Sequence, residues 1–237
     1  MGYVLRQAGR PCTIMGLRTT LIRMLQDGQD RARLARKGPI GDFYRAGGND
    51  LLNVLPVTTD DVVVDAGGFE GDWAAAMLVK FGCRAELFEP IPAFAEACRV
   101  RFAKNERVTV HEAALGGSER TARFAIDSVA SSEFTGRGPG SIDARVLDIA
   151  DVTIRLLAAH RDVACLKLNI EGGEYEVLER LAGCGALARC RSVLVQFHAQ
   201  PDGWDERLRR ARIELGKAHR CAWQFPMVWE LWETHAC

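Results

Sequence analysis

The stretch VVVDAGGFEGDW, Val62 to Trp73, joins a short apolar run to the start of a helical pattern through a glycine-rich turn. The apolar run at 62–66 has the length and composition of a buried strand. Residues 72–81 have the pattern of a helix. A strand, a turn and a helix in this order begin a βαβ unit, so the stretch predicts the start of a parallel sheet.

The same alternation continues towards the C-terminus. Short apolar runs predict strands at residues 85–88, 108–111, 163–170 and 192–197, and helical patterns predict helices at 92–104, 150–160, 174–182 and 204–219. Residues 116–147, rich in Gly and Ser, predict a hairpin or an excursion over the sheet rim, and residues 221–232 predict a final pair of aromatic strands. Strands alternating with helices indicate an α/β fold with a doubly wound, mostly parallel sheet.

The composition is that of an ordinary globular protein, because 48% of the 237 residues are hydrophobic and 26% are charged. Lys plus Arg and Asp plus Glu balance at 31 each. The chain therefore has no overall basic field of the kind that nucleic-acid-binding proteins use, and we expect no nucleic-acid partner. None of the eight cysteines lies in a C-x-x-C motif. We expect reduced thiols, a cytoplasmic protein and no metal site.

Residues 1–48 differ from the rest of the chain because basic residues outnumber acidic ones there. A basic amphipathic helix is predicted at 14–36, and KGPIG at 37–41 ends it. We divide the chain into a basic helical extension, residues 1–48, and one domain, residues 49–237. The extension is either a solvated helix surface or a weak membrane-surface contact. No run has the length of a transmembrane helix.

Two cofactors fit parts of the glycine-rich turn. A dinucleotide loop has the pattern G-x-G-x-x-G, but Ala66 replaces its first glycine and Glu70 would lie beside a pyrophosphate. S-adenosylmethionine (SAM) has a sulfonium and an amino-acid group but no phosphate, and its binders have the pattern D-x-G-x-x-x-G. Glycine-rich turns also occur without any nucleotide. The cofactor-binding candidates in the turn are Asp65, Gly67, Gly68 and Gly71.

Glu89 ends the next predicted strand and is a further cofactor candidate. An acidic residue at this place accepts hydrogen bonds from the ribose hydroxyls of an adenosine. NAD-binding proteins use the same contact, so Glu89 supports an adenosine cofactor rather than SAM in particular. The alternative is a surface acid before Pro90.

The stretch LKLNIEGGEYEVL, Leu166 to Leu178, carries a row of polar residues into the end of a predicted core strand. Side chains alternate along a strand, so Lys167, Asn169 and Glu171 are predicted to share one face. Buried parallel strands are normally apolar on both faces, and ligands bind beyond their carboxyl ends. Either Lys167 pairs with a neighbouring acid while Glu171 and Glu174 belong to a helix start, or the row faces a ligand.

Blocks along the chain resemble the FkbM family of SAM-dependent methyltransferases. They are VVVDAGGFEGDWA, LFEPIPAFAEACRVRF, LKLNIEGGEYEVLERL and VLVQFH, and FPMVWELW at 225–232 is similar to the closing strand of one bacterial subgroup. The resemblance covers about residues 55–233, and K-x-[DN]-x-E-G-x-E is its most specific part. It implies a class I methyltransferase (Rossmann-like) fold, with a mostly parallel seven-stranded sheet and one antiparallel strand near the C-terminus.

The resemblance also implies where SAM binds. Its amino-acid end would lie against Asp65, Gly67 and Gly71, its ribose against Glu89, and its adenine between Glu112 and Ala113. Two positions depart from the usual family pattern. Phe69 stands where Asn is frequent, and Asn169 stands where Asp is frequent, which makes Asn169 a poor general base.

FkbM relatives look like O-methyltransferases, so the implied acceptor is a sugar hydroxyl of a glycan or a small natural product. An alcohol needs a base as it attacks. His198 is the candidate, because its unperturbed pKa lies near neutrality and it follows the strand at 192–197. Glu171 is the rival base. Lys167 would orient an acid or bind the acceptor, and Asn169 would position the acceptor or the SAM amine.

Two other functions are consistent with parts of the sequence. An NAD-dependent oxidoreductase is disfavoured by Glu70 and by the missing first glycine. A non-catalytic SAM- or nucleotide-binding module is disfavoured because Asp65 and Glu89 are both present.

Overall fold

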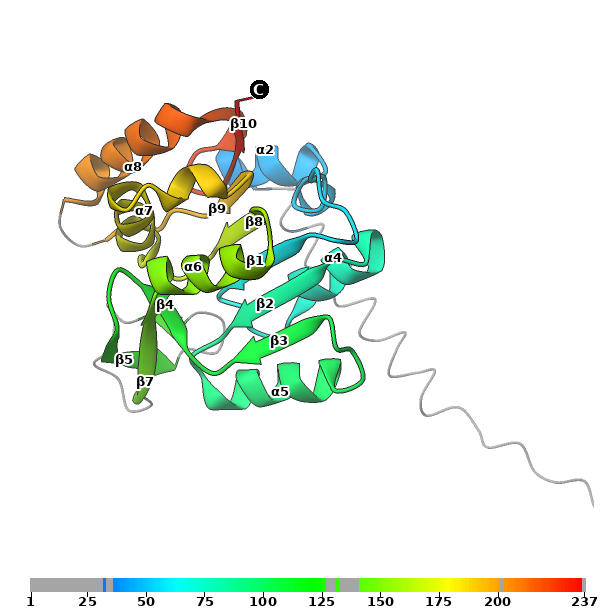
Figure 1. Cartoon of the computed structure of the whole chain (residues 1–237). Helices are drawn as coiled ribbons and strands as arrows, with labels where there is room; N and C mark the ends of the chain where they lie inside the picture. Colours follow the sequence, from blue (N-terminus) through cyan, green and yellow to red (C-terminus); the bar gives the residue numbers. More distant parts are fainter. Residues whose placement is uncertain (1–31, 33–35, 127–130, 133–140, 201–202, 236–237) are drawn as a thin grey trace, which may run out of the picture. The chain divides into compact units, whose positions relative to one another are not determined.

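The computed structural model describes residues 32, 36–126, 131–132, 141–200 and 203–235 (Figure 1). The chain divides into two compact units, Met1–Ala46 and Gly47–Cys237. In the first unit, helix α2 (Pro39–Arg45) begins with a proline, and Arg45 forms an ion pair with Asp42. Most of the helix predicted at 14–36 lies outside the described residues.

The second unit is built on a seven-stranded sheet with the order β10-β11-β9-β8-β1-β2-β3. Its strands are β1 (Val62–Ala66), β2 (Arg84–Phe88), β3 (Val108–His111), β8 (Val163–Leu168), β9 (Ser192–Val195), β10 (His219–Phe225) and β11 (Trp229–Thr234). Neighbouring strands from β9 to β3 pair in parallel, whereas β11 is antiparallel to both of its neighbours. The predicted class I methyltransferase fold, with one antiparallel strand near the C-terminus, is confirmed.

Helices of this unit lie on both sides of the sheet (Figure 1). They are α3 (Gly48–Leu51), α4 (Asp72–Phe81), α5 (Pro92–Phe102), α6 (Ile149–Ala159), α7 (Glu174–Gly183), the short 3₁₀ helix η1 (Ala186–Arg189) and α8 (Trp204–Ala218). The largest core cluster joins apolar residues of α6, α7 and α8 to Val64, Leu166 and Val193. Because side chains alternate across strands, Asp65 and Lys167 face away from this cluster.

A second, four-stranded sheet has the order β4-β7-β5-β6. Its strands are β4 (Ala114–Gly116), β5 (Arg120–Ile126), β6 (Ser131–Ser132) and β7 (Ser141–Asp148). Ala122, Phe124 and Val146 pack with Ile91 in a small core of their own. The excursion predicted at 116–147 is thus a sheet with a hydrophobic core. Residues 127–130 and 133–140 of the predicted excursion lie outside the described residues.

Candidate active site

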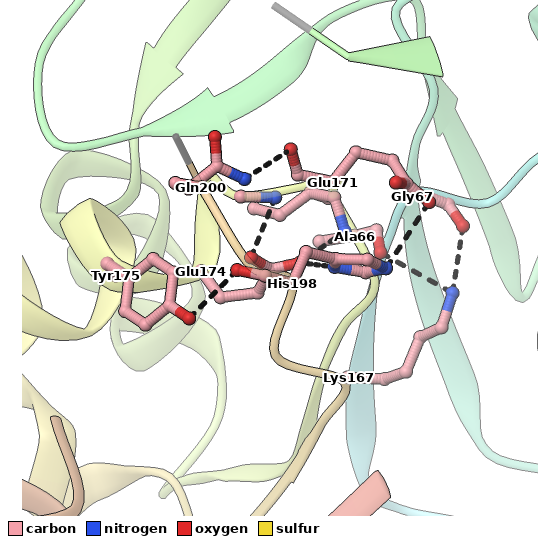
Figure 2. Close-up of polar contacts among 10 residues, drawn as sticks. Ala66, Gly67, Lys167, Glu171, Glu174, Tyr175, His198 and Gln200 are labelled. Carbon is pink, nitrogen blue, oxygen red and sulfur yellow. Dashed lines mark hydrogen bonds and ion pairs between the residues drawn. The ribbon is translucent and has the colours of Figure 1, made fainter. Parts of the chain in front are cut away.

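Asp65 and Lys167 form a buried ion pair at the carboxyl ends of β1 and β8. The two residues are register partners on adjacent strands, and their side chains are 0% and 7% exposed. Lys167 Nζ lies 2.7 Å from Asp65 Oδ1. It also donates to the carbonyl oxygen of Gly67 at 2.8 Å (Figure 2). Lys167 therefore orients an acid and ties it to the glycine turn.

The glycine turn after β1 needs glycine at its first position. Gly67 has φ +76°, in the left-handed region, and an added Cβ would overlap the carbonyl oxygen of Asn169. Asn169 also donates its backbone N–H to the carbonyl of Ala66 at 3.2 Å. The turn and the segment after β8 are thus in direct contact, which brings Asn169 next to the cofactor candidates.

Two buried acceptors at this turn have no hydrogen-bond partner within the described residues. They are Asp65 Oδ2 and Asn169 Oδ1. Buried polar atoms are nearly always hydrogen-bonded. Two acceptor oxygens without a partner at the same turn therefore indicate a place where a ligand supplies the hydrogen-bond donors. The SAM ammonium group has three N–H donors and fits this acceptor set.

Glu89 supports the turn from the neighbouring strand. Its side chain accepts the backbone N–H of Phe69 at 2.8 Å and that of Ile91 at 2.9 Å. Burial raises the pKa of Glu89, against the lowering effect of these two hydrogen bonds. Each carboxylate oxygen has a second lone pair, so contact with a ribose hydroxyl is compatible with both bonds.

The two adenine candidates lie beyond β3. Glu112 forms an ion pair with Arg99 of α5 at 2.9 Å, while Ala113 is buried. Among the described residues, no hydrogen bond or ion pair joins Glu112 to the glycine turn.

The polar row predicted on one strand face divides between a strand and a turn. Strand β8 ends at Leu168, so the strand predicted at 163–170 extends past its true end. Glu171 has φ +52° and Gly172 φ +108°, and these left-handed residues turn the chain into α7. The turn takes Glu171 away from Lys167 and towards His198, whose Nε2 lies 3.3 Å from Glu171 Oε1.

His198 lies between two carboxylates (Figure 2). Its Nδ1 is 2.7 Å from Glu174 Oε1, and Glu174 is fully buried. Burial lowers the pKa of His198, but the hydrogen bond to Glu174 and the charges of Glu174 and Glu171 outweigh it, so the pKa of His198 is raised. Burial also raises the pKa of Glu171, which His198 lowers in part. The geometry makes His198 a more basic imidazole than usual.

Glu174 and Tyr175 are the residues that sequence reasoning missed. The sequence identified Glu174 only as an acid at a helix start, and α7 does begin there. Tyr175 is buried and donates its hydroxyl to the backbone carbonyl of His198 at 2.9 Å. The sequence signal that could have identified both residues is their position directly after the E-G-G motif at 171–173. Their partner, His198, lies in the segment after β9, and the sequence does not give that pairing.

Metal binding and membrane insertion have no candidates in the part of the chain that the structure describes. No group of three or more His, Cys, Asp or Glu residues there could hold a metal ion. None of the helices described is both long and apolar enough to cross a bilayer.

The sheet order, with β11 alone antiparallel, and the glycine turn beyond β1 define a class I methyltransferase fold. The family model described as methyltransferase FkbM domain matches residues 62–225. The chain belongs to the FkbM methyltransferase family, and the resemblance in the sequence is confirmed.

Comparison with solved structures gives matches at low sequence identity. An rRNA-methylase candidate from Clostridium thermocellum has a TM-score of 0.51 at 12% identity, over 86% of this chain and 99% of that chain. An rRNA methylase from Streptococcus thermophilus has a TM-score of 0.45 at 12% identity, over 80% and 95%. A precorrin-6y methyltransferase from Geobacter metallireducens has a TM-score of 0.43 at 14% identity, over 79% and 87%. The first of these likenesses supports the fold alone. The comparison with curated protein sequences gave no match.

Proposed function

We propose that this protein is a SAM-dependent O-methyltransferase that acts on a sugar hydroxyl of a glycan or on a small natural product. The observation that carries the proposal is the imidazole of His198, which is paired with buried Glu174 at 2.7 Å. Family membership supports methyl transfer, and the paired imidazole supports a hydroxyl as the acceptor. An alcohol is a weak nucleophile at neutral pH, so its attack benefits from a base that removes its proton.

The unpaired acceptors support SAM as the cofactor. Asp65 Oδ2 and Asn169 Oδ1 would bind the SAM ammonium group, and Lys167 keeps Asp65 in place. Glu89 would bind the ribose hydroxyls, and Glu112 and Ala113 stay the predicted adenine contacts. When bound, SAM supplies the methyl group and the sulfonium leaving group.

The charge of the site favours an uncharged acceptor. Four carboxylates, those of Asp65, Glu89, Glu171 and Glu174, lie around the turn and His198 with Lys167 as a counter-ion. A phosphate group would be repelled by such an environment. A neutral sugar hydroxyl is therefore a better acceptor than a nucleic acid or a phosphorylated metabolite.

His198 would take the hydroxyl proton on Nε2, because Nδ1 is engaged by Glu174. Glu171, next to Nε2, remains the rival base. The acceptor oxygen would bond to the methyl carbon as its proton passes to His198 Nε2 and the methyl–sulfur bond breaks, so the products would be a methyl ether and S-adenosylhomocysteine. Near-attack alignment of the acceptor supplies much of the acceleration.

Replacing His198 by alanine is expected to lower turnover by roughly 10²–10⁴-fold with little change in SAM affinity. The wild-type rate should rise with pH through the raised pKa of His198, because only the neutral imidazole accepts a proton. The assay follows transfer of labelled methyl groups from SAM to neutral glycans and hydroxylated natural products. His160→Ala, which changes a histidine at the end of α6, is the matched control. Wild-type turnover in His198→Ala, or label on nitrogen or carbon, would contradict the proposal.

A further inference from the structure

Glu174 makes more contacts than a helix-start acid requires. Its Oε1 accepts the backbone N–H of Ile170 at 3.0 Å and faces His198 Nδ1 at 2.7 Å, and its Oε2 accepts the N–H of Gly172 at 2.8 Å. The backbone donors precede α7 instead of belonging to its first turn. The imidazole follows β9, which lies distant in the sequence. This carboxylate therefore joins the turn after β8 to the segment after β9.

These contacts decide where the His198 proton resides. An ionised carboxylate only accepts hydrogen bonds, so it favours a hydrogen on the ring nitrogen closest to it. Nδ1 lies 2.7 Å from Glu174, whereas Nε2 lies 3.3 Å from Glu171, so the hydrogen of the neutral ring is assigned to Nδ1. A neutral His198 ring then has its hydrogen on Nδ1 and its lone pair on Nε2. Tyr175 fixes the backbone of the same residue through its hydroxyl. Within the residues that the structure describes, the charged groups that pair with the ring are Glu174 from α7 and Glu171 from the preceding turn.

We propose that Glu174 is a positioning residue for methyl transfer: it fixes the tautomer and orientation of His198 and holds the turn that carries Glu171. This inference rests on the proposed function, in which His198 takes the hydroxyl proton. Outer carboxylates that orient a histidine in other sites typically contribute 10–100-fold to its activity or affinity. Glu174 touches neither acceptor nor cofactor in this account and acts through His198.

The wild-type protein alone provides the first test. Long-range ¹H–¹⁵N spectra of histidine-labelled protein, recorded above the pKa of His198, report which ring nitrogen carries the hydrogen. The His198→Asn variant assigns the signal, because its resonances disappear. A hydrogen on Nδ1 is expected. A ring with its hydrogen on Nε2 would overturn the inference, and this measurement needs neither an acceptor nor a Glu174 variant.

Glu174→Gln provides the second test, with Glu179→Gln on the exposed side of the same helix as its control. In Glu174→Gln we expect the pKa of His198 to fall, the rising, acidic limb of the pH–rate profile to move to lower pH with it, and kcat to fall roughly 10–100-fold. SAM affinity should stay unchanged. Glu174→Asp keeps the charge. In this variant the pKa of His198 should lie between its values in Glu174→Gln and in the wild type. Glu179→Gln should match the wild type throughout.

An unchanged His198 titration in a folded Glu174→Gln protein would overturn the inference. If that variant does not fold, the tautomer in the wild type decides. Failure of the proposed function would show itself differently, as wild-type protein that does not bind SAM or does not methylate oxygen, whatever the His198 spectra report.

Discussion

Replacing Lys167 by methionine should lower the free energy of unfolding by about 3–5 kcal/mol, because it leaves the fully buried carboxylate of Asp65 without its counter-ion. The ammonium group also donates to the carbonyl of Gly67. Methionine has a similar length and fills the space, so the change tests charge and hydrogen bonding rather than volume. Urea unfolding followed by circular dichroism measures the effect.

Two further variants identify the cause of the loss of stability in Lys167→Met. Lys217→Met removes a lysine that pairs with Glu214 on the surface of α8, and surface pairs contribute about 0–1 kcal/mol. Lys167→Met combined with Asp65→Asn removes both charges and should recover part of the stability, because no unpaired buried charge remains. A Lys167→Met protein as stable as Lys217→Met would contradict the assigned ion pair.

Gly67→Ala should destabilise the protein by about 2–5 kcal/mol and weaken SAM binding. An L-residue at φ +76° is strained by about 1–2 kcal/mol. The new Cβ would also overlap the backbone carbonyl of Asn169, which cannot swing aside as a side chain can, and overpacking typically costs about 1–3 kcal/mol. Movement of this turn would shift the Asp65 and Asn169 acceptors apart.

Gly216→Ala is the matched control, because an added Cβ meets nothing within 4 Å there. Gly216 is exposed within α8, where alanine favours the helix by about 0.5–1 kcal/mol. This variant should therefore be slightly more stable than the wild type. Equal stabilities for Gly67→Ala and Gly216→Ala would mean that the turn does not lie against Asn169.

The sequence predicted the central sheet because alternating apolar runs and helical patterns are local signals. The bounds of β1, β3 and α4 agree with the predicted ranges. The antiparallel strand β11 came from family resemblance, since no periodicity distinguishes strand direction. The end of β8 was misjudged because the apolar–polar alternation continues formally to Glu171, whose left-handed backbone has no signature in a non-glycine residue.

The contacts within the site were harder to predict than the candidates themselves. Lys167 and Asp65 are 102 residues apart, and only the register of β1 against β8 makes them partners. The sequence left open whether Lys167 pairs with an acid or faces a ligand. Glu174 resembled any acid at a helix start, because its contact with His198 depends on where the segment after β9 lies.

We infer that the glycine turn and the segment after β8 enclose the amino-acid end of SAM. Calorimetric titration of the wild type and Asn169→Ala with SAM, S-adenosylhomocysteine and NAD tests it most directly. We expect SAM and S-adenosylhomocysteine to bind the wild type, NAD not to bind, and Asn169→Ala to lose about 0.5–1.5 kcal/mol of SAM binding energy with the loss of one hydrogen bond. Binding of NAD in preference to SAM, or unchanged SAM affinity in Asn169→Ala, would contradict it.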